Sequence, residues 1–398
     1  MGLRHCGLQT LSGPALIEAT RSPTRSPLLG LPASVESVGL GVAATYGNPF
    51  TEQRDLLGGS ALVDLSHRGV IAVTGADRLS WLDSLLSQEL RSLTPGESTE
   101  ALLLDPHGHI EHALRILDDG VTTWLLVDED RSPSLTKWLD RMRFMKQVEV
   151  TDVSGTVATF GAFVAAESAI GTLEEIALAP EGAPLVWVDP WNHVSVGGWQ
   201  YADDADHPAG HWNYREVLVS RDRVPELVQL MKLKNISPAG LIALDALRIA
   251  AWRPRVTAEG DATALPHETD WLRSAVHLNK GCYRGQETVA KVHNLGRPPR
   301  RLVFLTLDGS DAVLPEPGTP VFFADAEVGR ITSSGRHFEE GAVALAVIKR
   351  SVAPDAELVV HVDSVEVAAA QIVIVPTDAG RVANVPRIPR LGKVARPV

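Results

Sequence analysis

The sequence predicts an α+β protein made of two α/β halves followed by a small β-barrel. Two observations predict the halves: strand-like and helix-like segments alternate over 69–150, and a comparable order returns over 157–251. A third observation predicts the barrel, because from residue 302 the chain breaks into short apolar segments separated by turns. The order strand–helix–strand–strand–helix suggests ferredoxin-like halves, in which helices pack on one face of a sheet.

The first half opens with a buried strand over 69–73, followed by a helix that Thr74 caps. The apolar segments 101–104 and 113–117 flank a run of turn residues and predict a hairpin. A second helix is expected to begin at Ser132, because Ser followed by Pro is a favourable pair for the N-cap and the first turn.

The second half repeats this order before the chain changes character. Strands are expected over 157–164, 185–188 and 216–219, ahead of helices over 224–234 and 237–251. The barrel strands are shorter and follow one another at turn-bounded intervals: 302–307, 320–323, 329–332, 342–348, 358–362 and 365–375.

We divide the chain into four parts. Residues 1–54 are rich in Ser, Thr, Gly and Pro without a sustained apolar period, so we expect a flexible N-terminal segment. Its Arg- and Ser-rich composition also resembles a mitochondrial transit peptide, which stays open as the alternative. Residues 55–300 form a module with two halves, at about 55–153 and 154–300. A barrel follows over 301–376, and residues 377–398 form a basic flexible tail.

Charge and cysteine content exclude several classes of protein. Lys and Arg number 37 against 49 Asp and Glu, and the formal net charge of −12 argues against general binding to nucleic acid. Two cysteines, Cys6 and Cys282, are too few for a disulfide framework and indicate a reducing compartment. The longest stretch without a charged residue, 37–51, is too short for a transmembrane helix. We expect a cytoplasmic protein in a bacterium, or a mitochondrial matrix protein in a eukaryote, without membrane contact.

The joint between module and barrel is basic although the chain is acidic. Between residues 248 and 301 there are ten Arg or Lys and five Asp or Glu, a net charge of +5. A basic island in an acidic protein attracts an anionic ligand to that place, because the rest of the surface repels it. The alternative is a solvated linker whose charge is incidental.

Within this island, the motif Lys280-Gly-Cys-Tyr-Arg-Gly-Gln-Glu287 is the strongest functional candidate. Helical spacing begins at Gln286, so Cys282 is expected just before a helix N-terminus, with Lys280 and Arg284 on either side. The helix end and the two cations favour the thiolate, which predicts a reactive sulfur. The alternative is a buried structural cysteine.

The motif resembles the signature of the YgfZ-type folate-binding proteins, which are relatives of the glycine-cleavage aminomethyltransferase, or T-protein. The resemblance extends from about Asp64 to Thr377. It implies tetrahydrofolate or a derivative, including polyglutamylated forms, as the cofactor. The segment Tyr214-Arg-Glu-Val-Leu-Val219 resembles the T-protein segment whose glutamate holds the pterin, which gives that role to Glu216. A carboxylate suits this role because it accepts two N–H donors from a pterin edge.

The resemblance also implies the other site residues. Cys282 is the expected functional thiol, with Lys280 and Arg284 beside it. The expected folate contacts come from both regions of the module: Tyr214, Glu216, Arg248, Tyr283, Gln286 and Glu287. No metal site is predicted from the histidines of the hairpin, because they have no partner cysteines: His107, His109 and His112.

Two departures from the T-protein pattern affect the predicted chemistry. In T-proteins an aspartate pair follows the hairpin turn and serves methylene transfer, and the alignment places His112 and Ala113 there. A folate-contacting arginine of the T-proteins corresponds to Leu244, whereas Arg248 matches. These differences indicate that the fold and the pocket are kept, while the group that handles the proton is not.

The favoured hypothesis is therefore a tetrahydrofolate-binding accessory factor for iron–sulfur cluster assembly or repair, and not a classical enzyme. The resemblance implies iron–sulfur client enzymes as partners, including those that modify tRNA, and we expect a monomer. The alternative is an active folate-dependent aminomethyltransferase. A Cys–His hydrolase is a weaker third hypothesis, because no oxyanion motif accompanies the histidines that would activate Cys282: His267, His277 or His293.

Overall fold

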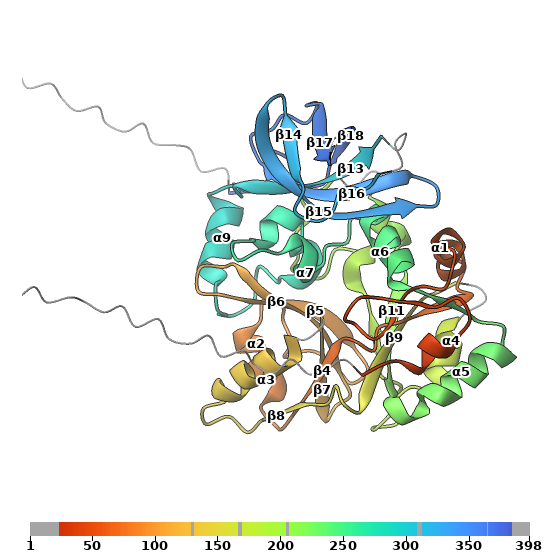
Figure 1. The fold of residues 1–398 in the computed structure, drawn as a ribbon. Helices are drawn as coiled ribbons and strands as arrows, with labels where there is room; N and C mark the ends of the chain where they lie inside the picture. The colour runs from red at the N-terminus through yellow and green to blue at the C-terminus, as the bar shows by residue number, and fades with distance from the viewer. Residues whose placement is uncertain are drawn as a thin grey trace, which may run out of the picture.

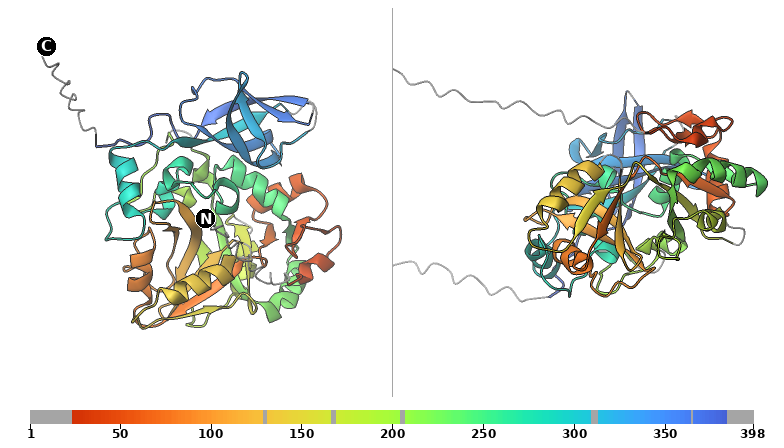
Figure 2. Two further views of the ribbon diagram at one scale, coloured as in Figure 1. Left: turned by 60° about the vertical axis from the view of Figure 1, so that its left-hand side comes forward. Right: turned by 90° about the horizontal axis from the view of Figure 1, so that it is seen from below.

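The computed structural model describes residues 24–128, 131–165, 169–203, 207–308, 313–363 and 365–383. Two mixed α/β layers lie side by side, and the barrel lies above them in the view of Figure 1. The left view of Figure 2 keeps the barrel at the same end of the molecule. The predicted α+β class, with two α/β halves and a C-terminal barrel, is confirmed.

The first sheet is antiparallel, with the strand order β5-β6-β7-β4-β8. One of its faces packs against the helices α2 (Arg78–Leu85) and α3 (Ser132–Arg141). Helix α3 begins at Ser132 as predicted, but its N-cap is Arg131 and not Ser132. Helix α2 begins later than predicted, because Thr74 is still paired with neighbouring strands as the last residue of β4. The strands are β4 (Gly69–Thr74), β5 (Ser98–Leu104), β6 (Ile110–Asp118), β7 (Thr122–Val127) and β8 (Glu149–Asp152).

The second sheet has the order β10-β11-β9-β3-β12, and α4 (Ala169–Glu175) and α5 (Val224–Leu233) cover one face. Its strand β3 comes from the part of the chain that we assigned to the first half, and it pairs with β9 and β12. The two halves are therefore interleaved, and the expected division at residue 153 does not separate the sheets. The strands are β3 (Ala61–Asp64), β9 (Val157–Phe163), β10 (Val186–Val188), β11 (Tyr214–Ser220) and β12 (Ser237–Ala239).

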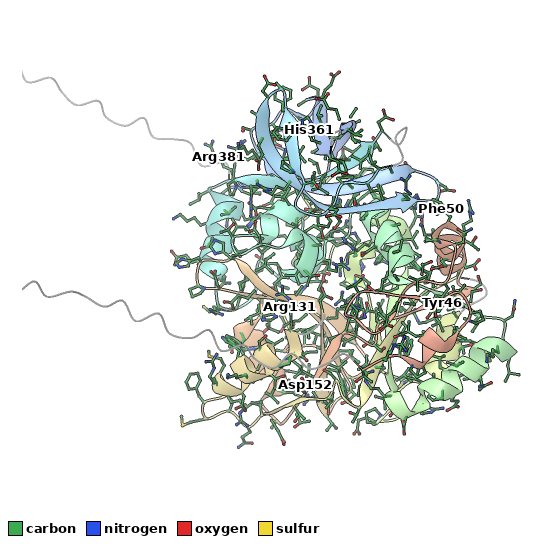
Figure 3. The ribbon with its side chains drawn as sticks, in the orientation of Figure 1. Tyr46, Phe50, Arg131, Asp152, His361 and Arg381 are labelled. Atoms are coloured by element: carbon green, nitrogen blue, oxygen red, sulfur yellow. The ribbon has the colours of Figure 1, made fainter. Side chains whose placement is uncertain are left out.

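The N-terminal segment corrects another expectation. Residues 1–23 lie outside the described residues, but from residue 24 onward the chain is folded, so a flexible segment over 24–54 is wrong. Leu28 and Leu56 are buried, and the Asn48 side chain caps the next helix by accepting from the Phe50 N–H. The elements are η1 (Pro27–Gly30), β1 (Val35–Glu36), β2 (Ala43–Thr45) and α1 (Pro49–Leu57). Figure 3 shows Tyr46 and Phe50 on the side of the second sheet.

Short helices connect the second sheet to the barrel. Gly335 of the barrel lies against Ala246 of α6, where a side chain on residue 335 would contact the helix. None of the helices in the described ranges has the length and apolar character to cross a bilayer. The helices are α6 (Leu241–Ala250), α7 (Val256–Glu259), α8 (Leu272–Ala275) and α9 (Gln286–Asn294), with short 3-10 turns at η3 (Pro190–Asn192), η4 (Pro208–His211), η5 (Arg221–Arg223) and η6 (Pro266–Thr269).

The barrel is closed, with the strand order β13-β16-β15-β14-β17-β18. Beyond it, Val382 and Ala383 donate backbone hydrogen bonds to the end of α9, so the first residues of the expected flexible tail are docked. Residues 384–398 lie outside the described residues. The strands are β13 (Arg300–Leu307), β14 (Pro320–Phe323), β15 (Ala326–His337), β16 (Gly341–Lys349), β17 (Leu358–Val362) and β18 (Val365–Val373).

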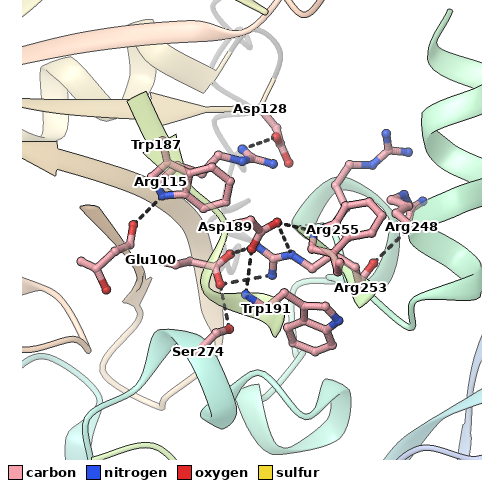
Figure 4. Close-up of polar contacts among 12 residues, drawn as sticks. Glu100, Arg115, Asp128, Trp187, Asp189, Trp191, Arg248, Arg253, Arg255 and Ser274 are labelled. Carbon is pink, nitrogen blue, oxygen red and sulfur yellow. Dashed lines mark hydrogen bonds and ion pairs between the residues drawn. The ribbon is translucent and has the colours of Figure 1, made fainter. Parts of the chain in front are cut away.

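A buried arginine joins the two sheets. Arg253 donates to both carboxylate oxygens of Glu100 on β5, at 3.1 and 2.6 Å, and to Asp189, which follows β10, at 3.2 Å (Figure 4). Its guanidinium lies 5.1 Å from the centroid of the Trp191 ring. Ser274 donates to Glu100 from α8. Charges buried this deeply are stable only when each has its partners, so Arg253 fixes how the sheets meet.

We expect Arg253→Met to destabilise the protein strongly. The substitution keeps most of the side-chain volume but leaves the carboxylates of Glu100 and Asp189 buried without their cation, which typically costs about 3–5 kcal/mol. The measurement is the free energy of unfolding in urea. Arg223→Met is the matched control, because Arg223 pairs with Glu226 at an exposed site and its loss is expected to change little. Equal effects of the two substitutions would contradict the assigned role of Arg253.

Candidate functional site

A cavity lies where the two sheets meet α6. Both sheets and α6 contribute to its wall, as does the segment between β3 and β4. Its lining is unusually polar for a position between two sheets: Leu65, His67, Arg68, Arg115, Asp128, Asp189, Trp212, Tyr214, Glu216, Leu241, Leu244, Asp245, Arg248, Arg253, Pro254 and Arg255.

Strand β11 places Glu216 in this cavity. Alternate residues of a strand share a face, so Tyr214, Glu216 and Leu218 point inward while Val217 packs against α4 and α5. The Glu216 side chain is only 1% exposed. Its Oε1 accepts a hydrogen bond from Nη1 of Arg68 and lies 3.4 Å from Nε of Arg115. Its Oε2 is buried without a hydrogen-bond partner. One carboxylate oxygen is therefore left for a donor from outside the chain.

Two arginines and two carboxylates form the charged centre of the cavity. Arg115 donates to Asp128 at 2.9 Å, and Arg68 Nε lies 3.8 Å from the same carboxylate (Figure 4 shows the Arg115–Asp128 contact). Burial opposes the charge of Asp128, but the adjacent Arg115 and Arg68 outweigh it and hold the pKa of that carboxyl well below its usual range. Asp128 is therefore ionised at neutral pH, and with Glu216 it balances the two arginines.

Two further polar atoms in the lining have no partner. Tyr214 Oη and His67 Nδ1 are both buried without a hydrogen bond. Burial, with a smaller contribution from the charge of Arg68, lowers the pKa of His67 to about 3. The imidazole is therefore neutral and can either donate or accept a hydrogen bond. The cavity thus combines unused acceptors and donors, an arrangement that suits a polar ring.

Arg248 also lines the cavity, and it connects α6 to the barrel. It donates to Asp245 at 2.7 Å, to Glu259 of α7 at 3.2 Å and to the Ser333 hydroxyl of β15 at 2.6 Å. The sequence predicted Arg248 as a folate contact, and the structure brings it to the same cavity as Glu216 and Tyr214.

A second, larger cavity of about 770 Å³ opens between α6, α7 and the barrel strand β15. Asp245, Arg248 and Arg255 line both cavities, so the two are adjacent. Arg255 Nε and the Thr257 hydroxyl are buried here without a hydrogen-bond partner. Five cationic side chains line this cavity, against four carboxylates: Arg248, Arg255, Arg300, Arg330 and Lys349.

The cysteine motif lies elsewhere. Cys282 is exposed in the loop before α9, which begins at Gln286 as predicted, and none of the residues 280–287 lines either described cavity. The sequence-predicted site is therefore divided into a cavity group and a cysteine loop. Because Cys282 is exposed, the alternative interpretation as a buried structural cysteine is wrong.

Both cations flanking Cys282 are engaged by other groups. Lys280 Nζ donates to the backbone carbonyls of Asp83, Leu86 and Gln88 at 2.6–2.8 Å, at the C-terminal end of α2. Arg284 pairs with Glu111 of β6, and its guanidinium lies 5.5 Å from the centroid of the Trp138 ring. The sequence could not show these partners, because they come from segments more than 140 residues away. Lys280 and Arg284 anchor the loop to the first sheet and its helices.

The other predicted folate contacts of the motif are also placed by the loop. Tyr283 is buried, with its ring centroid 5.4 Å from Lys280 Nζ. Gln286 donates to the Lys280 carbonyl at 3.3 Å, and Glu287 is exposed. Close packing fixes the loop against the hairpin, since a Cβ on Gly285 would lie 2.6 Å from the Asp105 carbonyl. The structure does not bring these three residues to Glu216.

The histidines proposed for a hydrolase have partners of their own. His267 contacts the Val289 carbonyl, His293 contacts Tyr201 Oη at 2.9 Å, and His277 accepts from the Asn279 N–H. In the hairpin, His109 contacts Asp105 at 2.9 Å. Among the described residues, no group of three or more His, Cys, Asp or Glu side chains is arranged to hold a metal ion.

The two positions that replace the aspartate pair point in opposite directions. Ala113 packs in the core between the sheets, on the same side of β6 as Arg115. The neighbouring His112 faces away from that core; burial, with the nearby charge of Arg131, lowers its pKa to about 4. A carboxylate that faced the cavity would therefore have to stand at position 113.

Sequence reasoning missed seven charged residues of the cavity. A signal existed for some of them, because Arg115 stands between apolar residues of a predicted strand and Arg68 directly precedes another. A charged residue in such a position requires a buried partner. Which partner it has depends on how the sheets meet. The seven are Arg68, Arg115, Asp128, Asp189, Asp245, Arg253 and Arg255.

Comparison with known proteins agrees with this architecture. Residues 300–377 match the family model of the glycine cleavage T-protein C-terminal barrel domain. The crystal structure of the glycine cleavage system aminomethyltransferase T from Bartonella henselae superposes with a TM-score of 0.70 at 16% identity, covering 89% of this chain and 97% of that one. The chain therefore shares its fold with an aminomethyltransferase T, and its residues 300–377 match the T-protein barrel domain.

Two curated relatives extend the comparison. An aminomethyltransferase of Synechococcus sp. (strain CC9311) is 27% identical over 320 residues, which are 75% of this chain and 82% of the relative. A mitochondrial homolog of the iron–sulfur cluster assembly factor IBA57 from Mycosarcoma maydis is 26% identical over 266 residues, which are 62% of this chain and 57% of the relative. The chain is thus similar to proteins of two named functions.

Proposed function

We propose that this chain is a tetrahydrofolate-binding accessory factor of the YgfZ type, which helps to assemble or repair iron–sulfur clusters in client enzymes. The observation that carries the folate part is the unpartnered Oε2 of Glu216 in a cavity between two sheets. The name of the Mycosarcoma maydis relative supports the iron–sulfur part.

The cavity residues fit the ring of a folate. A pterin edge presents N–H donors, which Glu216 Oε2 would accept, and Tyr214 Oη and His67 Nδ1 would be available to other polar atoms of the ring. A hydrogen bond to a buried charged oxygen is stronger than one between neutral groups. When bound, the folate supplies a carrier for a one-carbon unit. The chain's own residues hold and orient the ring.

The second cavity suits the anionic tail of a folate. Arg255 lies in both cavities, and its buried Nε, like the Thr257 hydroxyl, has no hydrogen-bond partner. Glutamyl carboxylates are the kind of acceptor that these donors need. A folate with its ring at Glu216 would place its tail beside α7 and the barrel, and its affinity would fall with added salt.

The cysteine loop supplies the contact with client proteins in this proposal. Cys282 is exposed on a loop that Lys280 and Arg284 hold in place from within. A single thiolate cannot hold a cluster alone, so Cys282 would act as a transient ligand while a client supplies the others. We place this activity in the bacterial cytoplasm or, in a eukaryote, in the mitochondrial matrix, with the protein acting as a monomer.

An aminomethyltransferase is the second candidate, because relatives with that name are as similar to this chain as the iron–sulfur factor is. Ala113 counts against it, since the position on the cavity face of β6 carries no group that could take or give a proton.

Glu216→Gln tests the folate site. The substitution keeps the size of the side chain and an acceptor for Arg68, but it removes the negative charge and replaces one oxygen with a donor. We expect tetrahydrofolate affinity to fall by roughly 1.5–3 kcal/mol, the worth of a hydrogen bond to a charged group. Titration with tryptophan fluorescence measures it. The matched control is Glu174→Gln, at a half-exposed pair with Arg215. Unchanged affinity in Glu216→Gln would remove Glu216 from the site.

Cys282→Ala tests the cysteine loop. In cells that lack the protein, we expect wild type and Cys6→Ala to restore the activity of iron–sulfur enzymes under oxidative stress, and Cys282→Ala to fail. The Cys282→Ala protein should still bind folate normally, because the loop lies outside both cavities. Full restoration by Cys282→Ala would show that the thiol is not the functional group.

An assay for aminomethyl transfer separates the two candidate functions, because only the transferase alternative predicts turnover. Supplied with an aminomethyl-lipoyl donor and tetrahydrofolate, the wild-type chain should form methylene-tetrahydrofolate no faster than the uncatalysed background, because no carboxylate stands at position 113. The assay follows methylene-tetrahydrofolate, with an authentic aminomethyltransferase as the positive control. Robust turnover would replace the accessory-factor proposal with the enzyme.

A further inference from the structure

We propose that Arg68 determines the specificity of the Glu216 cavity, selecting a 2-amino-4-oxo pyrimidine ring over a 2,4-diamino ring. The inference rests on the proposed folate function and deepens it, since it names the atom of the ring that the chain recognises besides the amino group. Its basis is a buried guanidinium that donates to one carboxylate oxygen of Glu216 while the other oxygen has no partner.

Arg68 is held in the cavity but keeps donors to spare. Its side chain is 8% exposed, and Nη1 donates to Oε1 of Glu216 while Nε lies 3.8 Å from Asp128. A guanidinium has five N–H donors in one plane. Neither contact involves Nη2, so the donors of this nitrogen and the acceptor Oε2 belong to one ion pair and take no part in either contact.

An acceptor next to a donor is the pattern that a 2-amino-4-oxo ring complements. The 2-amino group and N3–H of such a ring donate to the carboxylate, and its 4-oxygen accepts from the guanidinium. Both rings carry the 2-amino donor, so the contact of Glu216 with that group does not distinguish them. N3 carries a hydrogen only in the 4-oxo ring, so the contact of Glu216 with N3 contributes part of the preference, and Arg68 contributes the rest. The 4-amino ring presents an N–H donor where the 4-oxo ring presents an acceptor. In the 4-amino ring, this N–H donor would face the N–H donors of Arg68. A buried polar group left unpaired in this way costs affinity.

The charge balance of the cavity points the same way. Arg68 and Arg115 are matched by Glu216 and Asp128, and Arg253, a further arginine of the lining, contacts both Glu100 and Asp189. A 2,4-diamino ring is more basic than a 4-oxo ring and tends to bind as a cation. In this cavity it would add a positive charge beside two arginines, whereas the neutral 4-oxo ring adds none.

The test compares two ligands and two proteins. Full-length wild type is titrated with tetrahydrofolate and with its 4-amino-4-deoxy analogue, by calorimetry at neutral pH. We expect wild type to bind tetrahydrofolate about tenfold to a hundredfold more tightly than the analogue. Arg68→Met, which keeps the length of the side chain without its donors, should lower that ratio severalfold, leaving only the part that the contact of Glu216 with N3 contributes. Arg223→Met, at an exposed pair, is the matched control and should leave the ratio unchanged.

The outcomes separate this inference from the function on which it rests. If wild type binds neither ligand, the folate proposal itself is wrong. If wild type binds both equally, or if Arg68→Met keeps the wild-type ratio, folate binding stands and the role of Arg68 is wrong. Arg68→Lys provides a second variant in case Arg68→Met does not fold, because it keeps the charge opposite Glu216; it should bind tetrahydrofolate but discriminate less, since an ammonium group does not reproduce the planar fork of donors. Full discrimination by Arg68→Lys would also contradict the inference.

Discussion

The buried contact of Arg253 with Glu100 and Asp189 is the interaction on which the rest of the molecule depends. It joins a strand of the first sheet to the segment after β10 of the second, and Ser274 and Trp191 complete it. Hydrophobic packing alone allows sheets to slide over one another, whereas buried charges tolerate one arrangement in which each has its partner. The Glu216 cavity lies beside this contact and shares Arg253 and Asp189 with it. The walls of the cavity therefore depend on this contact.

The requirement that buried charges have partners also explains why the cavity and the cysteine loop suit different ligands. In the cavity, paired charges leave a small number of unused donors and acceptors, including Glu216 Oε2 and Tyr214 Oη, in a place that excludes water. In the loop, Lys280 and Arg284 pair with groups of α2 and β6, and Cys282 is exposed to solvent. One site suits recognition of a small molecule and the other suits contact with a protein. This separation favours an accessory factor, because a classical transferase joins its reacting groups in a single site.

Local pattern was enough to predict the layers, and it placed Glu216 on a strand and Cys282 before a helix. Local pattern did not predict contacts between segments that lie far apart in the sequence. Strand β3 looked like part of the first half, yet it pairs with β9 and β12 in the second sheet. Lys280 and Arg284 looked like neighbours of the thiol, because spacing along the chain does not show that their partners are Asp83 and Glu111. The N-terminal segment was missed for a similar reason, since Leu28 finds its apolar surroundings in the second half.

The most direct test of the central claim is a crystal structure of the full chain with bound tetrahydrofolate. The account predicts the amino-pyrimidine edge of the ring against Glu216 Oε2, with Arg68 beside the 4-oxygen and the glutamyl tail directed toward Arg255 and the barrel. The cysteine loop is expected to keep its present contacts with α2 and β6 in that complex. Folate bound outside this cavity, or a ring whose edge faces away from Glu216, would contradict the account.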